Sequence, residues 1–254
     1  MAIDHSFEIQ RRIQHLTTVL KPLGLSIPDA PNTSDPVIPT VTREDIAEAV
    51  AAAKDPASDK TVQRLVTAHQ LDGLGIVAGL RTIRAKAHDN AVRDALPHIN
   101  EQLHGIFNDA AEQLQEHGEQ FKGHQDLGAL NLATLPAHSA AAAGAALDAC
   151  RTMETVHTAW VGVTTYGATP GHRLHFTDYG APTQEQYREA RDARPQTFPA
   201  ATPWAVYRKG WALDLPDTVR AAQQRRADYQ TTAIRAEQSQ AQEARRAGLR
   251  GGSL

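Results

Sequence analysis

The stretch that decides the fold is residues 137–149, which read AHSAAAAGAALDA and contain eight alanines and one glycine. Alanine has the highest helix propensity of all residues, and a helix of small side chains can be approached closely by its neighbours. The stretch therefore predicts a helix at the centre of a bundle, continuing to about Thr164. The side chains expected on its buried side are Leu147, Cys150, Met153, Val156, His157 and Trp160.

Upstream of this helix, the sequence predicts a helical body that extends from residue 42 to residue 164. Thr42 followed three residues later by Asp45 is a capping box, which opens a helix. Apolar residues then recur at helical spacing from Leu74 to about His117. A kink or a break is expected near Ala95, because Pro97 cannot continue the backbone hydrogen bonds of a helix.

The first 41 residues predict an arm and a linker. An apolar stripe at spacings of four, three and four residues predicts an amphipathic helix within residues 1–21. Five prolines in residues 22–41 predict an extended linker, since proline lacks a backbone donor. The arm is therefore expected to dock either on its own body or on a neighbouring subunit. Its stripe is Ile9, Ile13, Leu16 and Leu20.

Aromatic residues gather after the alanine-rich helix. Nine of the thirteen lie between Trp160 and Trp211. Because aromatic side chains dominate protein cores and interfaces, this uneven distribution indicates a separate module. Residues 165–216 also hold six prolines and four glycines, which predicts an irregular α+β module. We expect a strand at 173–177 paired with residues 204–207, and a short helix at 184–193. The nine aromatics are Trp160, Tyr166, Phe176, Tyr179, Tyr187, Phe198, Trp204, Tyr207 and Trp211.

Residues 217–254 predict a polar helix and tail rich in arginine and glutamine, so the fold class as a whole is mainly α. This tail carries seven arginines against four acids, whereas residues 1–135 carry twelve basic residues against eighteen acids. An acidic body with a basic end can steer the association of copies. The four acids dilute the arginines, which disfavours nucleic acid as the partner.

Candidate chemistry is sparse, and the sequence predicts no catalytic residues, no cofactor and no metal. The glycines of residues 73–79 do not have the spacing of a dinucleotide loop. His172, His175 and Asp178 lie close in sequence and suit a metal, but nothing fixes a further ligand, and surface histidines are the ordinary interpretation. The single cysteine, Cys150, excludes an internal disulfide. The first 25 residues lack the apolar region of an ordinary secretory signal, and no stretch is apolar for the length of a membrane span. We therefore expect a protein without membrane contact that stays in the cytoplasm or is exported by a route that reads no such signal.

The overall composition resembles that of virion structural and assembly proteins of phages that infect high-GC Gram-positive bacteria. The features that carry the resemblance are twenty arginines against six lysines, the alanine-rich helices, the proline-rich arm and the Arg/Gln-rich end. The resemblance implies a capsid-associated, minor capsid or scaffolding component that would reside in the virion. It transfers no functional residue, because no motif carries it.

Three function classes follow from these features. The first is a non-enzymatic structural or assembly protein whose partners are copies of itself or other structural subunits. The second is a small-molecule enzyme with a pocket between the aromatic module and the helical body, lined by His172, His175, Asp178 and Tyr179. The third is a nucleic-acid-binding module that uses the basic tail. For the first class, the residues expected to contact a partner are Ile9, Ile13, Leu16, Leu20, Trp204, Tyr207, Trp211, Arg225, Arg226 and Tyr229.

Overall fold

The computed structural model describes residues 5–31, 41–168, 172, 174–192 and 202–250. Within them the protein is mainly α, as the sequence predicts, with eight α-helices and a two-stranded sheet. The chain divides into two compact units, residues 1–17 with 26–95 and residues 18–25 with 96–254, which we call the first and the second unit. In the described part of the chain, no helix has the length and apolar content that a membrane crossing requires.

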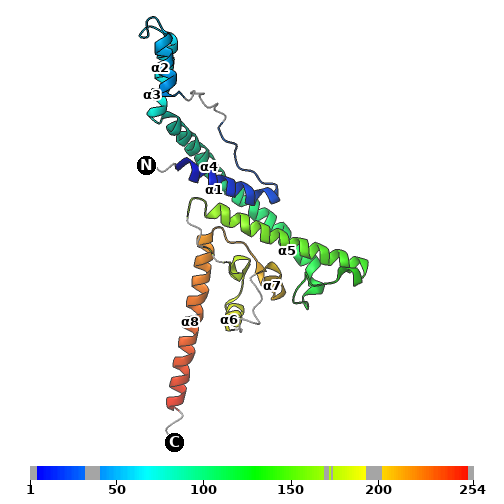
Figure 1. The fold of residues 1–254 in the computed structure, drawn as a ribbon. Coiled ribbons are helices and arrows are strands. Elements are labelled where there is room, and N and C mark those ends of the chain that lie inside the picture. The colour runs from blue at the N-terminus through cyan, green and yellow to red at the C-terminus, as the bar shows by residue number, and fades with distance from the viewer. Residues whose placement is uncertain (1–4, 32–40, 169–171, 173, 193–201, 251–254) are drawn as a thin grey trace. The chain divides into compact units, whose positions relative to one another are not determined.

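The first unit contains a helical hairpin made of α2 (Arg43–Ala52) and α3 (Lys60–Gly73), which lie side by side in Figure 1. The capping box forms as predicted: the Thr42 hydroxyl accepts a hydrogen bond from the Asp45 amide at 3.1 Å, and the Asp45 carboxylate accepts from the Thr42 amide at 2.7 Å. Gly75, at φ 67°, then makes the turn into α4 (Ile76–Gly118).

Of the kink or break expected near Ala95, the break does not occur, since α4 is one helix of 43 residues with Pro97 inside it. The lost backbone bond is offset by packing on both sides of the proline, where Val92 and Ile99 are buried. The division between the two units nevertheless falls within two residues of Pro97, between Ala95 and Leu96.

The alanine-rich stretch forms the start of α5 (Ala137–Thr164), which confirms the predicted bounds. Five of the six side chains expected on its buried side are buried, and Leu147 is half-buried. Three of its alanines, Ala143, Ala146 and Ala149, are also buried, so small residues lie where the helix is covered. Burial raises the pKa of the Cys150 thiol to about 12, which keeps it neutral.

The module after α5 is built differently from the prediction. Residues 176–178 form the 3₁₀ helix η4 (Phe176–Asp178) instead of a strand, and Arg173 lies outside the described residues, as does Phe198. Residues 204–207, which were expected to form the partner strand, belong instead to the helix α7 (Pro203–Arg208). A helix forms there because Thr202 caps it and Pro203 is preorganised for a first helical turn. The sheet pairs β1 (Gly180–Ala181) with β2 (Ala212–Leu213), antiparallel.

The remaining helices largely agree with the prediction. They are α1 (His5–Leu20), α6 (Gln184–Asp192) and α8 (Val219–Arg250), with the 3₁₀ helices η1 (Lys21–Leu23), η2 (Glu119–Phe121) and η3 (Leu132–Thr134). Pro22 is helical in η1 and not extended, since proline suits the first positions of a helix. Residues 32–40 of the linker and 251–254 of the tail lie outside the described residues.

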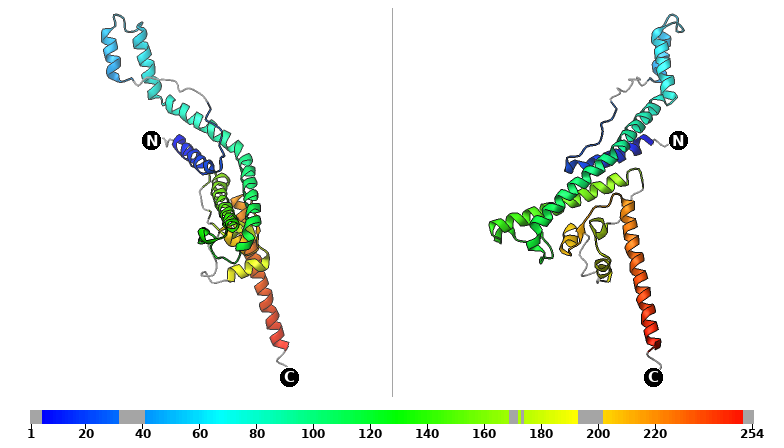
Figure 2. Two further views of the ribbon diagram at one scale, coloured as in Figure 1. Left: turned by 90° about the vertical axis from the view of Figure 1, so that its right-hand side faces the viewer. Right: turned by 180° about the vertical axis from the view of Figure 1, so that it is seen from behind.

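In the second unit, part of the aromatic module packs against α5 and part against α8. Elements η3 and α7 contact α5, while η4 and α6 contact α8. The views in Figures 1 and 2 agree that the end of α8 extends beyond α6 and α7. Consistent with these views, all side chains of residues 237–243 are exposed.

Candidate functional site

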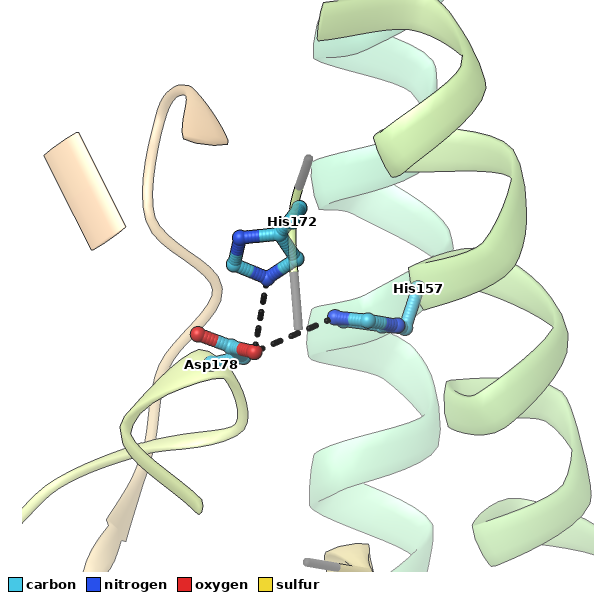
Figure 3. A group of neighbouring side chains, drawn as sticks. All are labelled: His157, His172 and Asp178. Atoms are coloured by element: carbon cyan, nitrogen blue, oxygen red, sulfur yellow. Dashed lines mark hydrogen bonds and ion pairs between the residues drawn. The ribbon is translucent and has the colours of Figure 1, made fainter. Parts of the chain in front are cut away.

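A buried polar cluster in the second unit joins three segments of the chain. His157 lies on α5, His172 lies in the segment after α5, and Asp178 ends η4 (Figure 3). The Asp178 side chain is fully buried, the His172 side chain is 3% exposed and the His157 side chain is 10% exposed. Polar groups enclosed to this degree require partners, which makes the cluster the candidate functional site.

Asp178 is at the centre of the cluster. Its Oδ2 atom lies 2.8 Å from Nε2 of His172 and 3.6 Å from Nε2 of His157, and it accepts a hydrogen bond from the His175 amide at 2.8 Å. Burial alone would raise the pKa of the Asp178 carboxyl, but its contacts with the two rings and the amide outweigh burial and hold the pKa below its usual value. The carboxyl group is therefore an anion in the folded protein.

Local sequence explains why Asp178 points inward. The carboxylate closes a capping box at the start of η4, in which Nδ1 of His175 also accepts a bond from the Thr177 amide at 3.3 Å. Thr177 is itself fully buried, so the turn is fixed on its inner side. His157 faces inward because it shares the buried side of α5 with Met153 and Trp160, at helical spacing.

Aromatic rings enclose the two histidines. The His157 ring lies with its centroid 4.9 Å from that of Tyr179 and 5.4 Å from that of Trp160. The indole of Trp160 also meets the His172 ring edge-on at 5.9 Å. Burial raises the pKa of the Tyr179 hydroxyl above its usual value, so this group stays neutral. Such walls exclude water and strengthen the electrostatic interactions inside the cluster.

The hydrogen bonds of the cluster are incomplete. Oδ1 of Asp178, Nε2 of His157 and Nε1 of Trp160 are buried, and each lacks a hydrogen-bond partner among the described residues. A buried polar atom without a partner costs about 1–3 kcal/mol of stability. The three potential ligand atoms of His157, His172 and Asp178 lie within 4.8 Å of one another. The cluster can therefore accept a further polar group or a cation.

The sequence identified two of these three residues. His172 and Asp178 come together, but the third member is His157 and not His175. The Nδ1 atom of His175 lies 2.8 Å from the Thr177 hydroxyl, and burial together with the nearby Arg226 lowers the pKa of His175 to about 4. His157 was expected on the buried side of its helix, but periodicity gives no signal that joins it to His172, fifteen residues beyond, or to the turn that ends at Asp178.

The residues expected to contact a partner are mostly covered by the chain itself. Ile9, Ile13, Leu16 and Leu20 are buried in the single chain, which agrees with the alternative that the arm docks on its own body. Trp204, Tyr207 and Trp211 are buried as well, so the structure of the single chain does not support partner contact through these seven side chains. The physical reason for the second group is that polar atoms of the aromatics find partners inside the unit. The Trp204 indole donates to the His124 carbonyl at 3.2 Å, and the Tyr207 hydroxyl to Glu119 at 3.0 Å.

The three polar members of the set are half-buried. Arg225 pairs with Asp214 and the Tyr229 hydroxyl donates to the Pro182 carbonyl, which fixes the start of α8 to the module. For Arg225, Arg226 and Tyr229, contact with a partner stays a prediction.

Comparisons with known proteins do not place the chain in a family. No protein family, no curated protein and no solved structure matched it.

Proposed function

We propose that this protein is a non-enzymatic structural or assembly protein that works through contacts between subunits. The observation that carries the proposal is an apolar stripe on the first half of α4 that remains open to solvent. Ile83 is 64% exposed and Ile76 38% exposed, Leu80 is half-buried, and Leu74 in the preceding turn is 75% exposed. Exposed apolar surface of this kind, bordered by polar residues, is typical of interaction sites.

The geometry of the helix shows that the stripe is separate from the covered side of α4. Successive residues are rotated by about 100° around a helix axis, so Ile76, Leu80 and Ile83 lie within about 60° of one another. The buried residues Ala85 and Val92 lie on the opposite side of the same helix. This part of α4 is therefore apolar on two sides, and only one of them is covered.

Charge indicates what kind of surface covers the stripe. Arg84 and Lys86 border it on its two sides, and no acidic residue occurs between positions 73 and 88. The second half of α4 has the opposite character: residues 96–118 contain no lysine or arginine, and their four acids are all exposed. These acids are Glu101, Asp109, Glu112 and Glu116, which share one side of the helix.

We therefore propose that copies join head to tail, with the apolar and basic stripe of one copy against the acidic side of α4 in the next. Such a contact uses two different surfaces, so repeated addition produces a ring if the rotation closes and a filament if it does not. The exposed end of α8 supplies a second element that another subunit can cover, because a polar helix gains little stability alone in water.

In its more specific form, the proposal places the protein in a phage virion as a capsid-associated, minor capsid or scaffolding component. What supports this form is composition: the excess of arginine over lysine, the alanine-rich helices and the Arg/Gln-rich end. Its test is whether the chain is found in purified particles of a host phage.

The test of assembly is the native mass of the purified protein, measured by native mass spectrometry and light scattering. We expect a defined oligomer for the unaltered chain and a monomer for Ile83→Glu, because the substitution places a charge in the stripe opposite an acidic surface. Leu132→Glu is the matched control, since Leu132 in η3 is 38% exposed but lies outside both the stripe and α8. A chain that stays monomeric at high concentration would contradict the proposal, as would equal effects of the two substitutions.

A further inference from the structure

The polar cluster of His157, His172 and Asp178 has a composition that needs explanation whether or not the chain assembles. Two imidazoles and a carboxylate from three separate segments meet in a largely buried place (Figure 3). A network held only by hydrogen bonds would pair each polar atom, because buried polar groups are nearly always paired. Here Oδ1 of Asp178 and Nε2 of His157 have no hydrogen-bond partner among the described residues.

A divalent cation among the three side chains would give Nε2 of His157 the partner that it lacks, with Oδ2 of Asp178 as a second ligand atom. Both imidazoles direct Nε2 toward the carboxylate in Figure 3, and a ring nitrogen offers a lone pair to a metal when the ring is neutral. Nitrogen and oxygen ligands bound to Zn²⁺ at about 2.0–2.2 Å lie about 3.3–3.5 Å from one another in a tetrahedral site. The separations here are 2.8 Å between His172 and Asp178 and 3.6 Å between His157 and Asp178, on either side of that value.

The donor set also restricts the ion. Imidazole suits zinc, iron, copper and nickel, whereas magnesium and calcium prefer sites made of oxygen atoms. Two histidines and one carboxylate with an open position is a set that binds Zn²⁺ or Fe²⁺ in proteins. The enclosing rings of Trp160 and Tyr179 add a water-excluding wall, which strengthens the attraction between a cation and the Asp178 carboxylate.

We propose that His157, His172 and Asp178 bind one divalent transition-metal ion, through Nε2 of each histidine and a carboxylate oxygen, with a fourth position left for water. The ion ties His172 and the turn η4 to α5. This proposal is independent of assembly, since all three ligands lie in the second unit and none belongs to the stripe on α4.

The experiment uses the full chain after treatment with a chelator, with Co²⁺ and Zn²⁺ as probes. We expect one Co²⁺ per chain, visible absorption bands of a four- or five-coordinate site, and loss of these bands when Zn²⁺ is added. Zn²⁺ should also raise the thermal unfolding temperature in proportion to occupancy, because a ligand that binds only the folded state stabilises it.

Variants locate the site. His172→Gln and Asp178→Asn should each weaken Zn²⁺ binding by about 100-fold or more, since substitution of an outer partner of a ligand alone costs about 10–100-fold. One histidine serves as a matched control. His138→Gln alters an exposed residue of the same helix α5, away from the capping box that orients Asp178. This control variant should bind Zn²⁺ and Co²⁺ as the unaltered chain does.

Several results would overturn the proposal. One is an unaltered chain that takes up no stoichiometric Co²⁺; another is a His172→Gln variant with the affinity and spectrum of the unaltered chain. If the ligand variants do not fold, as judged by circular dichroism, the Co²⁺ spectrum of the unaltered chain decides alone. The assembly-deficient Ile83→Glu variant must retain the metal, so failure of one proposal is distinguishable from failure of the other.

Discussion

Each of the two units of this chain is stabilised by a different kind of residue. In the second unit, Trp160, Phe107 and Met153 are fully buried, and the aromatic module closes around α5. In the first unit, none of the ten side chains of α2, all of them described, is buried, and Val50 on that helix is 40% exposed. The second unit therefore has a core of its own, whereas the hairpin of the first unit depends on caps and on a narrow contact between two helices.

This difference agrees with the division of roles that we propose. A unit that buries its large side chains is stable alone and can hold a specific site, such as the cluster around Asp178. A unit with open apolar residues such as Leu74 and Ile83 gains stability when another surface covers it. The contrast is open to direct measurement, because each unit offers matched positions for substitution.

The largest effect should come from Trp160→Ala. This substitution leaves a cavity in the core of the second unit, and loss of a buried tryptophan lowers the free energy of unfolding by about 3–5 kcal/mol. Ile83→Ala in the first unit removes an exposed side chain and should change that free energy by less than about 0.5 kcal/mol. Urea unfolding followed by circular dichroism measures both. Equal effects at the two positions would remove the contrast between the units.

Substitution of glycine by alanine should change stability with opposite signs in the two units. A Cβ atom at Gly180 would lie 2.5 Å from Cγ1 of Val206 and 3.0 Å from the Ala212 carbonyl, so Gly180→Ala should destabilise the second unit by about 1–3 kcal/mol. At Gly79 in α4 nothing lies within 4 Å, and Gly79→Ala should stabilise the helix by about 0.5–1 kcal/mol. Opposite signs in the unfolding midpoint are the expected outcome; two shifts of the same sign would contradict it.

The same contrast explains what the sequence could predict. Elements set by local chemistry were predictable: the alanine-rich run gave α5 its bounds, and Thr42 with Asp45 marked the start of α2. The aromatic module was not, because the alternation at residues 173–177 resembles a strand while Asp178 and Thr202 cap helical turns there.

Contacts between distant segments leave no local signal. The stripe of Ile9, Ile13 and Leu16 was correctly placed on a helix, but periodicity does not say whether the chain or a partner covers it. In the same way, the sequence placed His157 on a buried side without indicating that Asp178 would face it. Pairings of this kind depend on tertiary packing, which overrides what neighbouring residues favour.

We expect helix caps to contribute a larger share of the stability in the first unit than in the second. Thr42→Ala tests this expectation. The substitution removes the hydroxyl that accepts from the Asp45 amide, and loss of such an N-cap costs about 1 kcal/mol. Thr158→Ala on α5 is the matched control, because the Thr158 hydroxyl only donates to the Glu154 carbonyl within the helix and should be replaced at no cost. Hydrogen exchange at the amides of α2 and α5 reports each change separately. Faster exchange in α5 than in α2 would reverse the assignment.

The smallest expected effect concerns the contacts that attach the start of α8 to the rest of the second unit. Tyr229→Phe removes the hydroxyl that donates to the Pro182 carbonyl but keeps the ring stacked on Tyr187, with centroids 4.9 Å apart. One hydrogen bond at a half-buried position contributes about 0.5–1 kcal/mol, so exchange near the start of α8 should become only a few times faster. Tyr229→Ala also removes the stack and should have the larger effect of the two.

Neither change should alter exchange at residues 237–243, whose side chains are exposed in the single chain. If those distant amides are strongly protected in the unaltered protein and lose protection with Ile83→Glu, then another subunit covers the end of α8, because no described side chain of that segment is enclosed by its own chain.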